Sequence, residues 1–132
     1  MSKFHAGWGL LALACAGAAA AADQMGAKPF RVVVPFTPGS GSDMLGRLIA
    51  PKLGEAFGQQ VVVDNRAGAG STIGTALVAQ ATADGHTLLV TSSGFAGSAS
   101  IYPKLPYDPV KDFAGITQLI SNPLVLVVAP SF

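Results

Sequence analysis

The sequence predicts an α/β fold with an open, mainly parallel sheet flanked by helices. Three short apolar runs, rich in Val and Leu, alternate with segments of helical spacing; they lie at 30–36, 61–64 and 87–91. A loop of turn-forming residues, rich in Gly and Ser, follows each run. Strands that alternate with helices form βαβ units, so we expect parallel strands joined by right-handed crossovers.

The first predicted helix follows the turn at 37–42. Its apolar residues recur at three- and four-residue steps from Asp43 onward: Leu45, Leu48, Ile49, Leu53 and Phe57. Ser42 or Asp43 is expected to cap its N-terminus, and Gly58 marks its end. Pro51 lies inside the pattern, which predicts a kink or a helix in two pieces.

The same unit then repeats. A strand at 61–64 leads through a glycine-rich loop to a second helix, which Ser71 and Thr72 are expected to cap. Its apolar positions are Ile73, Ala76, Leu77 and Ala81. Asp84 and Gly85 turn the chain into the third strand. Beyond Gly94 the pattern weakens to a proline-rich loop at 101–109 and two further strand candidates, at 113–120 and 124–128.

Residues 1–22 resemble an export signal. Lys3 and His5 precede an apolar run, and small residues continue to Ala22, before Asp23 makes the chain polar. Signal peptidase accepts small side chains at such a junction, so cleavage is favoured over a membrane anchor. Lipid attachment at Cys15, the only cysteine, is disfavoured because Ala12 stands where a larger aliphatic residue is expected. Residues 23–132 would then form the exported domain, without a disulfide.

Charge and motif content exclude several classes of function. The chain of 132 residues carries a formal net charge of +1 without a basic cluster, which excludes a nucleic-acid surface. No spacing of His, Cys or carboxylates suits a metal, and Ser93 lacks the flanking glycines of a nucleophile elbow. His86 begins a strand, away from the glycine-rich loops, and is interpreted as an ordinary surface residue. The sequence therefore predicts no enzyme, no cofactor and no metal.

The three loops that follow the strands are the candidate site. In a parallel sheet they meet at one edge, where ligands bind. They offer backbone N–H groups, hydroxyls and helix N-termini, which suit a carboxylate or phosphate. Asp43 could cap its helix or bond a ligand. Arg66 could pair with a ligand carboxylate, or instead with an Asp or solvent.

A nucleotide-binding enzyme domain is the alternative. Gly39-Ser-Gly41 after the first strand, with Asp64 ending the second, imitates a dinucleotide fingerprint. Met44 occupies the place of the third glycine, however, and no phosphate-loop motif with Gly-Lys-Ser/Thr occurs.

Four segments in order, at 31–43, 58–70, 83–89 and 102–109, resemble the substrate-binding receptors of tripartite tricarboxylate transporters, the Bug family. The resemblance implies the first lobe of a type II periplasmic-binding-protein fold, which closes on its ligand like a flytrap. Members are more than twice as long, so we expect a truncated chain that lacks the second lobe. Ala67 and His86 depart from residues that are common in the family.

The resemblance also implies a function: a monomeric periplasmic receptor that captures a small carboxylate for a membrane permease. By motif, the ligand would face residues of all three loops: Phe36, Thr37, Pro38, Gly39, Ser40, Gly41, Ser42 and Asp43; Gly68, Ala69, Gly70 and Ser71; and Ser92 and Ser93. A flytrap gains affinity by burying its ligand between two lobes. The truncated chain is therefore expected to bind weakly or not at all.

Overall fold

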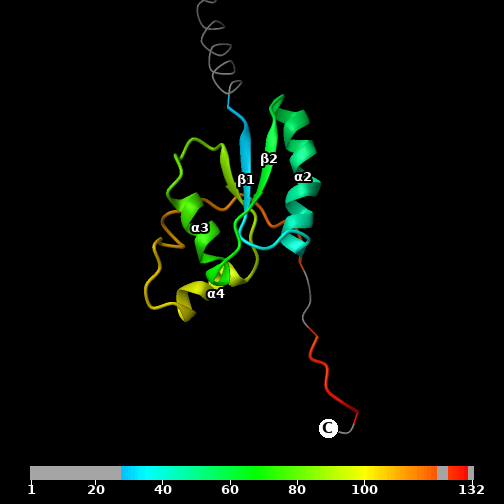
Figure 1. The fold of residues 1–132 in the computed structure, drawn as a ribbon, viewed down its shortest axis with the longest axis vertical. Coiled ribbons are helices and arrows are strands. Elements are labelled where there is room, and N and C mark those ends of the chain that lie inside the picture. Colours follow the sequence, from blue (N-terminus) through cyan, green and yellow to red (C-terminus); the bar gives the residue numbers. More distant parts are fainter. Residues whose placement is uncertain (1–27, 122–124, 131–132) are drawn as a thin grey trace, which may run out of the picture.

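The computed structural model describes residues 28–121 and 125–130, and it confirms the predicted fold class (Figure 1). In chain order the elements are β1 (Phe30–Val34), α2 (Gly41–Phe57), β2 (Val61–Asn65), a 3-10 turn (Ala69–Ser71), α3 (Thr72–Ala79), β3 (Thr87–Leu89) and α4 (Gly94–Ile101). The predicted export signal at 1–22, with Cys15, lies outside the described residues.

The sheet has three parallel strands in the order β2-β1-β3. Phe30 of β1 lies opposite Val61 of β2, and Arg31 lies opposite Thr87 of β3. Because all three strands run in the same direction, the loops that leave their carboxyl ends share one edge of the sheet.

Strand β1 forms the centre of the core. Val32, Val33 and Val34 are fully buried, since helices cover β1 on both faces, as the continuous valine run predicts. Figure 1 shows α2 on one side of the sheet and α3 on the other. The cluster that contains Val32 and Val34 packs against side chains of α2: Leu45, Ile49 and Leu53.

Helix α2 begins earlier than predicted and is capped by Ser40, whose Oγ accepts a hydrogen bond of 3.3 Å from the Asp43 N–H. The predicted caps, Ser42 and Asp43, lie instead in the first turn. The helix ends at Gly58 in the left-handed conformation, as predicted. It is not divided at Pro51: this residue is exposed, so water can satisfy the carbonyl that the missing N–H leaves unpaired.

Beyond β3 the sequence predictions are less accurate. Helix α4 was not predicted, because its run of Gly, Ala and Ser carries no apolar periodicity. Its Phe95 contacts Tyr107 and Phe113, with ring centroids 6.4 and 5.2 Å away. The strands predicted at 113–120 and 124–128 are wrong for the described residues among them, which are mostly exposed and have no neighbouring strand to pair with (Figure 1).

The prediction of His86 as a surface residue is wrong. Its position at the amino end of β3 is as expected, but the residue is only 8% exposed, and its ring stacks on Phe30 at 4.8 Å. The turn before it explains the burial. Asp84 accepts the His86 N–H at 3.0 Å, and the His86 Nδ1 lies 3.1 Å from the Asp84 carbonyl oxygen.

Replacing Gly74 with Ala should destabilise the fold. A Cβ at this position would lie 2.7 Å from the Arg66 carbonyl oxygen and 2.8 Å from Pro35 Cβ, because α3 packs closely on the end of β1. Overpacking of this kind costs about 1–3 kcal/mol. Gly97→Ala is the matched control, since its Cβ would meet only Ile101 Cδ1, at 4.0 Å. Urea unfolding should show a loss for Gly74→Ala alone; equal stability of the two variants would contradict this packing.

The free energy of unfolding should decrease at acidic pH, because Asp84 becomes protonated. A hydrogen bond from Lys28, and then one from the His86 N–H, lower the pKa of Asp84 to about 2. A carboxylate with a depressed pKa in the folded state contributes stability above its unfolded pKa, and this is lost as the pH falls from about 4 to about 2. Thermal melts of Asp84→Asn should therefore depend less on pH in this window; an unchanged dependence would contradict the assignment.

Candidate functional site

The three predicted loops meet at the carboxyl edge of the sheet. Hydrogen bonds join the first two: Asn65 Nδ2 donates to the Phe36 carbonyl oxygen at 3.2 Å, and the Arg66 N–H donates to the Val34 carbonyl oxygen at 2.8 Å. A helix or 3-10 turn begins within the last residues of each loop. The third helix, α4, is the one that the sequence did not predict.

The first loop presents free backbone donors at the N-terminus of α2. The N–H groups of Ser40, Asp43 and Met44 are all bonded within the loop and first turn. Those of Gly41 and Ser42 have no partner among the described residues. Gly41 is exposed and Ser42 partly so, which leaves two adjacent donors at the positive end of a 17-residue helix.

The other residues of this loop shape it. Thr37, Pro38 and Gly39 are exposed, and Phe36 packs against the core. Gly39 has a φ of 83°, a left-handed conformation that glycine adopts without a steric penalty. Its N–H does not point to solvent, because it donates to Asp43 Oδ2 at 2.8 Å.

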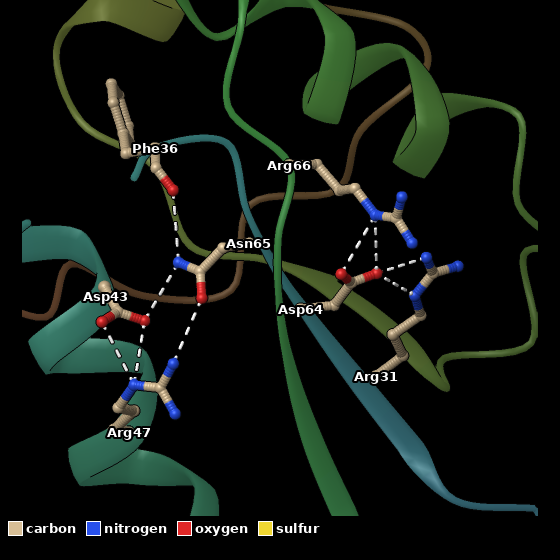
Figure 2. A network of polar contacts seen from close by, with 7 residues as sticks. All are labelled: Arg31, Phe36, Asp43, Arg47, Asp64, Asn65 and Arg66. Carbon is tan, nitrogen blue, oxygen red and sulfur yellow. Dashed lines mark hydrogen bonds and ion pairs between the residues drawn. The ribbon is translucent and has the colours of Figure 1, made fainter. Parts of the chain in front are cut away.

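Asp43 is the centre of a polar network (Figure 2). It is 3% exposed. Besides the Gly39 N–H, its carboxylate accepts from Asn65 Nδ2 at 3.0 Å and from Arg47 Nε at 3.1 Å. Arg47 Nη2 also donates to Asn65 Oδ1 at 3.2 Å, which closes the network between α2 and β2. These bonds, that of Gly39 foremost, lower the pKa of Asp43 to about 2, so the group is ionised at neutral pH.

The second loop has an unusual backbone. Four consecutive residues from Gly68 to Ser71 have positive φ, including the non-glycine residues Ala69 (45°) and Ser71 (81°). Such conformations cost free energy and occur preferentially at functional sites. The N–H groups of Gly68, Ala69 and Gly70 have no partner in the described part of the chain. The backbone is therefore held in a shape that leaves three donors unused.

A buried hydroxyl group lies beside these donors. Ser71 is 2% exposed and its Oγ has no partner in the described structure; as the N-terminal cap residue of α3 it makes no side-chain capping bond. Leaving a buried hydroxyl unpaired costs about 1–3 kcal/mol, unless a water or ligand atom reaches it. Gly70 lies against the Tyr102 hydroxyl, 2.6 Å from where a Cβ would stand. Sequence reasoning missed Tyr102, which comes from the loop after α4.

The third loop contributes exposed serines. Ser92 and Ser93 are exposed, and their hydroxyls have no partner within the described ranges. Thr91, which was assigned only to the third strand, has a buried and unpartnered Oγ1 next to them. The signal that could have found Thr91 is its position, two residues after the end of β3 at the same sheet edge.

Arg66 is held away from the candidate site. Its Nε donates to Asp64 Oδ2 at 3.0 Å, and Arg31 donates to the same oxygen. Figure 2 shows this group on the opposite side of β2 from Asp43. Burial raises the pKa of Asp64, but the two guanidinium groups outweigh it and lower the pKa overall. Asp64 is thus engaged by two arginines, which disfavours the ribose role that the nucleotide alternative gives it.

Other features of the described residues point to no second site. Residues 28–121 and 125–130 contain no group of three or more His, Cys, Asp or Glu residues that could hold a metal. Over the same residues, no helix is long and apolar enough to cross a membrane. A groove of about 410 Å³ between α2 and the edge strand β2 is lined by Arg47, Ala50, Pro51, Gly54, Val61 and Val63, and none of these belongs to the three loops.

Comparison with solved structures places this fold among periplasmic binding proteins. The periplasmic binding protein BugD matches 64% of the chain with a TM-score of 0.62 and 40% identity, over 28% of its own length. MatC from Rhodopseudomonas palustris, solved with bound malate, matches 66% with a TM-score of 0.60 and 36% identity, over 30% of its own length. The R. palustris protein Rpa4515, solved with adipate, matches 63% of the chain with a TM-score of 0.59 and 40% identity, over 28% of its length.

Sequence comparison gives the same result. Protein BugT of Bordetella pertussis is 43% identical over 122 residues, which cover 89% of this chain and 37% of BugT. A UPF0065 protein from the tcbD-tcbE intergenic region of Pseudomonas sp. strain P51 is 46% identical over 106 residues, 80% of this chain and 32% of that protein. The chain thus spans about a third of the length of these relatives.

The family model for the tripartite tricarboxylate transporter family receptor matches residues 45–132. This family consists of solute-binding receptors and not of enzymes, which confirms the predicted class of protein. The four ordered segments noted in the sequence had indicated the same family. The chain belongs to the tripartite tricarboxylate transporter receptors, the TctC or Bug family of periplasmic solute-binding proteins.

Proposed function

We propose that the three loops form one wall of a binding site for a small carboxylate in a periplasmic receptor that delivers its ligand to a membrane permease. The family supports a receptor, and relatives of the same fold have been solved with malate and adipate. Residues 1–22, with the composition of an export signal, support a periplasmic location.

The proposal of a carboxylate ligand rests on one observation: the adjacent free N–H groups of Gly41 and Ser42 at the start of α2. The unpaired N–H groups and the dipole of a helix together favour an anion at its N-terminus. A carboxylate has two oxygens and can accept from both N–H groups at once. Recognition through backbone donors requires no cationic side chain, which agrees with Arg66 being held on the other side of β2.

The other two loops suit the remainder of the ligand. The free N–H groups of Gly68, Ala69 and Gly70 offer a second set of donors, and the hydroxyls of Ser92 and Ser93 can both donate and accept. A dicarboxylate or hydroxy acid could therefore bond the first loop at one end and the other loops at its far end. Asp43, already bonded on both oxygens, has the least capacity to contact it.

The three loops would contact a bound carboxylate from one side. Solvent weakens hydrogen bonds that remain open to it, so we expect these loops by themselves to bind a carboxylate weakly, in a monomeric protein. Binding of a nucleotide is the competing function, and the engagement of Asp64 by Arg31 and Arg66 weighs against it.

Replacing Gly41 with Pro should weaken carboxylate binding selectively. Proline removes the N–H of the first helical residue, a position where it fits an α-helix well. Ser40, before it, already has the extended conformation that proline requires (φ −69°, ψ 161°). Losing one hydrogen bond to a charged group should cost about 1.5–3 kcal/mol, or about 10- to 100-fold in affinity for malate or adipate, followed by NMR titration.

Gly41→Ala is the matched control, because it retains the N–H and nothing lies within 4 Å of the added Cβ. This variant should bind as the unmodified chain does. Equal affinity of Gly41→Pro and Gly41→Ala would show that this donor does not hold the ligand. Saturable binding of a nucleotide, with no response to any carboxylate, would overturn the proposed function itself.

A further inference from the structure

Asp43 lies beside the candidate anion site and yet carries a negative charge. A carboxylate facing an anionic ligand would repel it, and the interaction is strong where solvent is excluded. The structure instead buries Asp43 and bonds both of its oxygens to groups of the protein. Arg47, one turn along α2, balances the charge.

The partners of Asp43 come from three different segments. Gly39 belongs to the first loop, Arg47 to α2, and Asn65 to the end of β2, where the second loop begins. Asn65 also donates to the Phe36 carbonyl oxygen, at the start of the first loop. The carboxylate and the amide therefore connect the beginning and the middle of the first loop to the second strand (Figure 2).

Resting on the proposed function, we propose that Asp43 and Asn65 are positioning residues that hold the first loop in its ligand-binding shape without contacting the ligand. The bond from Gly39 is central to this role. It turns the Gly39 N–H inward and fixes the residue two positions before Gly41 in its left-handed conformation. Gly41 and Ser42 then present their N–H groups in one fixed direction, and the ligand does not have to order the loop.

Asp43→Asn tests this role against Asp84→Asn. Each carboxylate accepts a backbone N–H and a cationic side chain, and each has a pKa of about 2, although Asp84 is the more exposed of the two. They lie at opposite ends of the sheet. Asp43→Asn should weaken malate binding about tenfold, the equivalent of roughly one hydrogen bond, whereas Asp84→Asn should leave it unchanged at comparable thermal stability.

Asn65→Ala provides a second variant that keeps the Asp43 charge paired with Arg47. It removes only the link to β2 and to Phe36, and it should weaken malate binding to a similar extent. A readout without ligand distinguishes Asp43→Asn from its control: hydrogen exchange at the Gly39 amide should accelerate in Asp43→Asn and stay unchanged in Asp84→Asn.

The sign of the affinity change separates positioning from contact. If Asp43 faced the ligand, removing its charge would strengthen malate binding, and that result would overturn the proposal. Unchanged affinity in both Asp43→Asn and Asn65→Ala would overturn it as well, while leaving the carboxylate site intact. Saturable binding of a nucleotide, with no response to any carboxylate, would refute the proposed function; unaltered hydrogen exchange of the Gly39 amide in Asp43→Asn would separately refute the positioning role.

Discussion

The burial of β1 between two layers of helices is the constraint on which the rest of the structure depends. Its three consecutive valines are excluded from solvent, and it pairs with both neighbouring strands. Parallel pairing on both sides brings three strand ends to one edge, so the loops after them are neighbours although they are far apart in the sequence. The close contact of Gly74 with the end of β1 fixes α3, and with it the second loop, against the first.

Polar contacts at this edge divide into two groups. Bonds between Asp43, Arg47 and Asn65 satisfy side chains within the protein, while backbone N–H groups in the first and second loops remain unused. Charged side chains thus shape the edge, and neutral backbone dipoles are the groups that the proposed function assigns to the ligand. Such an arrangement suits a receptor, which has to release its ligand. An arginine bonded to the ligand would add a strong charge-assisted hydrogen bond. Arg66, which the sequence offered as a partner for a ligand carboxylate, is instead bound to Asp64.

Fold and loops were predictable from the sequence because their signals are local. Continuous valine runs, Gly58 after a helical pattern and glycine-rich turns each depend on a few neighbouring residues. The burial of His86 and the helix α4 were not predicted, since each depends on contacts with residues distant in the sequence: with Phe30, and with Tyr107 and Phe113. The Ser40 cap is a local bond to Asp43, and the sequence prediction placed it two or three residues too late. The pairing of Asp43 with Asn65, 22 positions later, leaves no signal in either local sequence. The ligand-facing roles of the three loops stay predictions.

Residue-resolved NMR of the chain during titration with malate tests the central claim most directly, because it reports on each backbone N–H separately. If a carboxylate is held by the helix N-terminus, the amide signals of Gly41 and Ser42 should shift most, with smaller changes at Gly68, Ala69 and Gly70 and none at the opposite end of the sheet near His86. Shifts that avoid Gly41 and Ser42, or that cluster in the groove between α2 and β2, would contradict it.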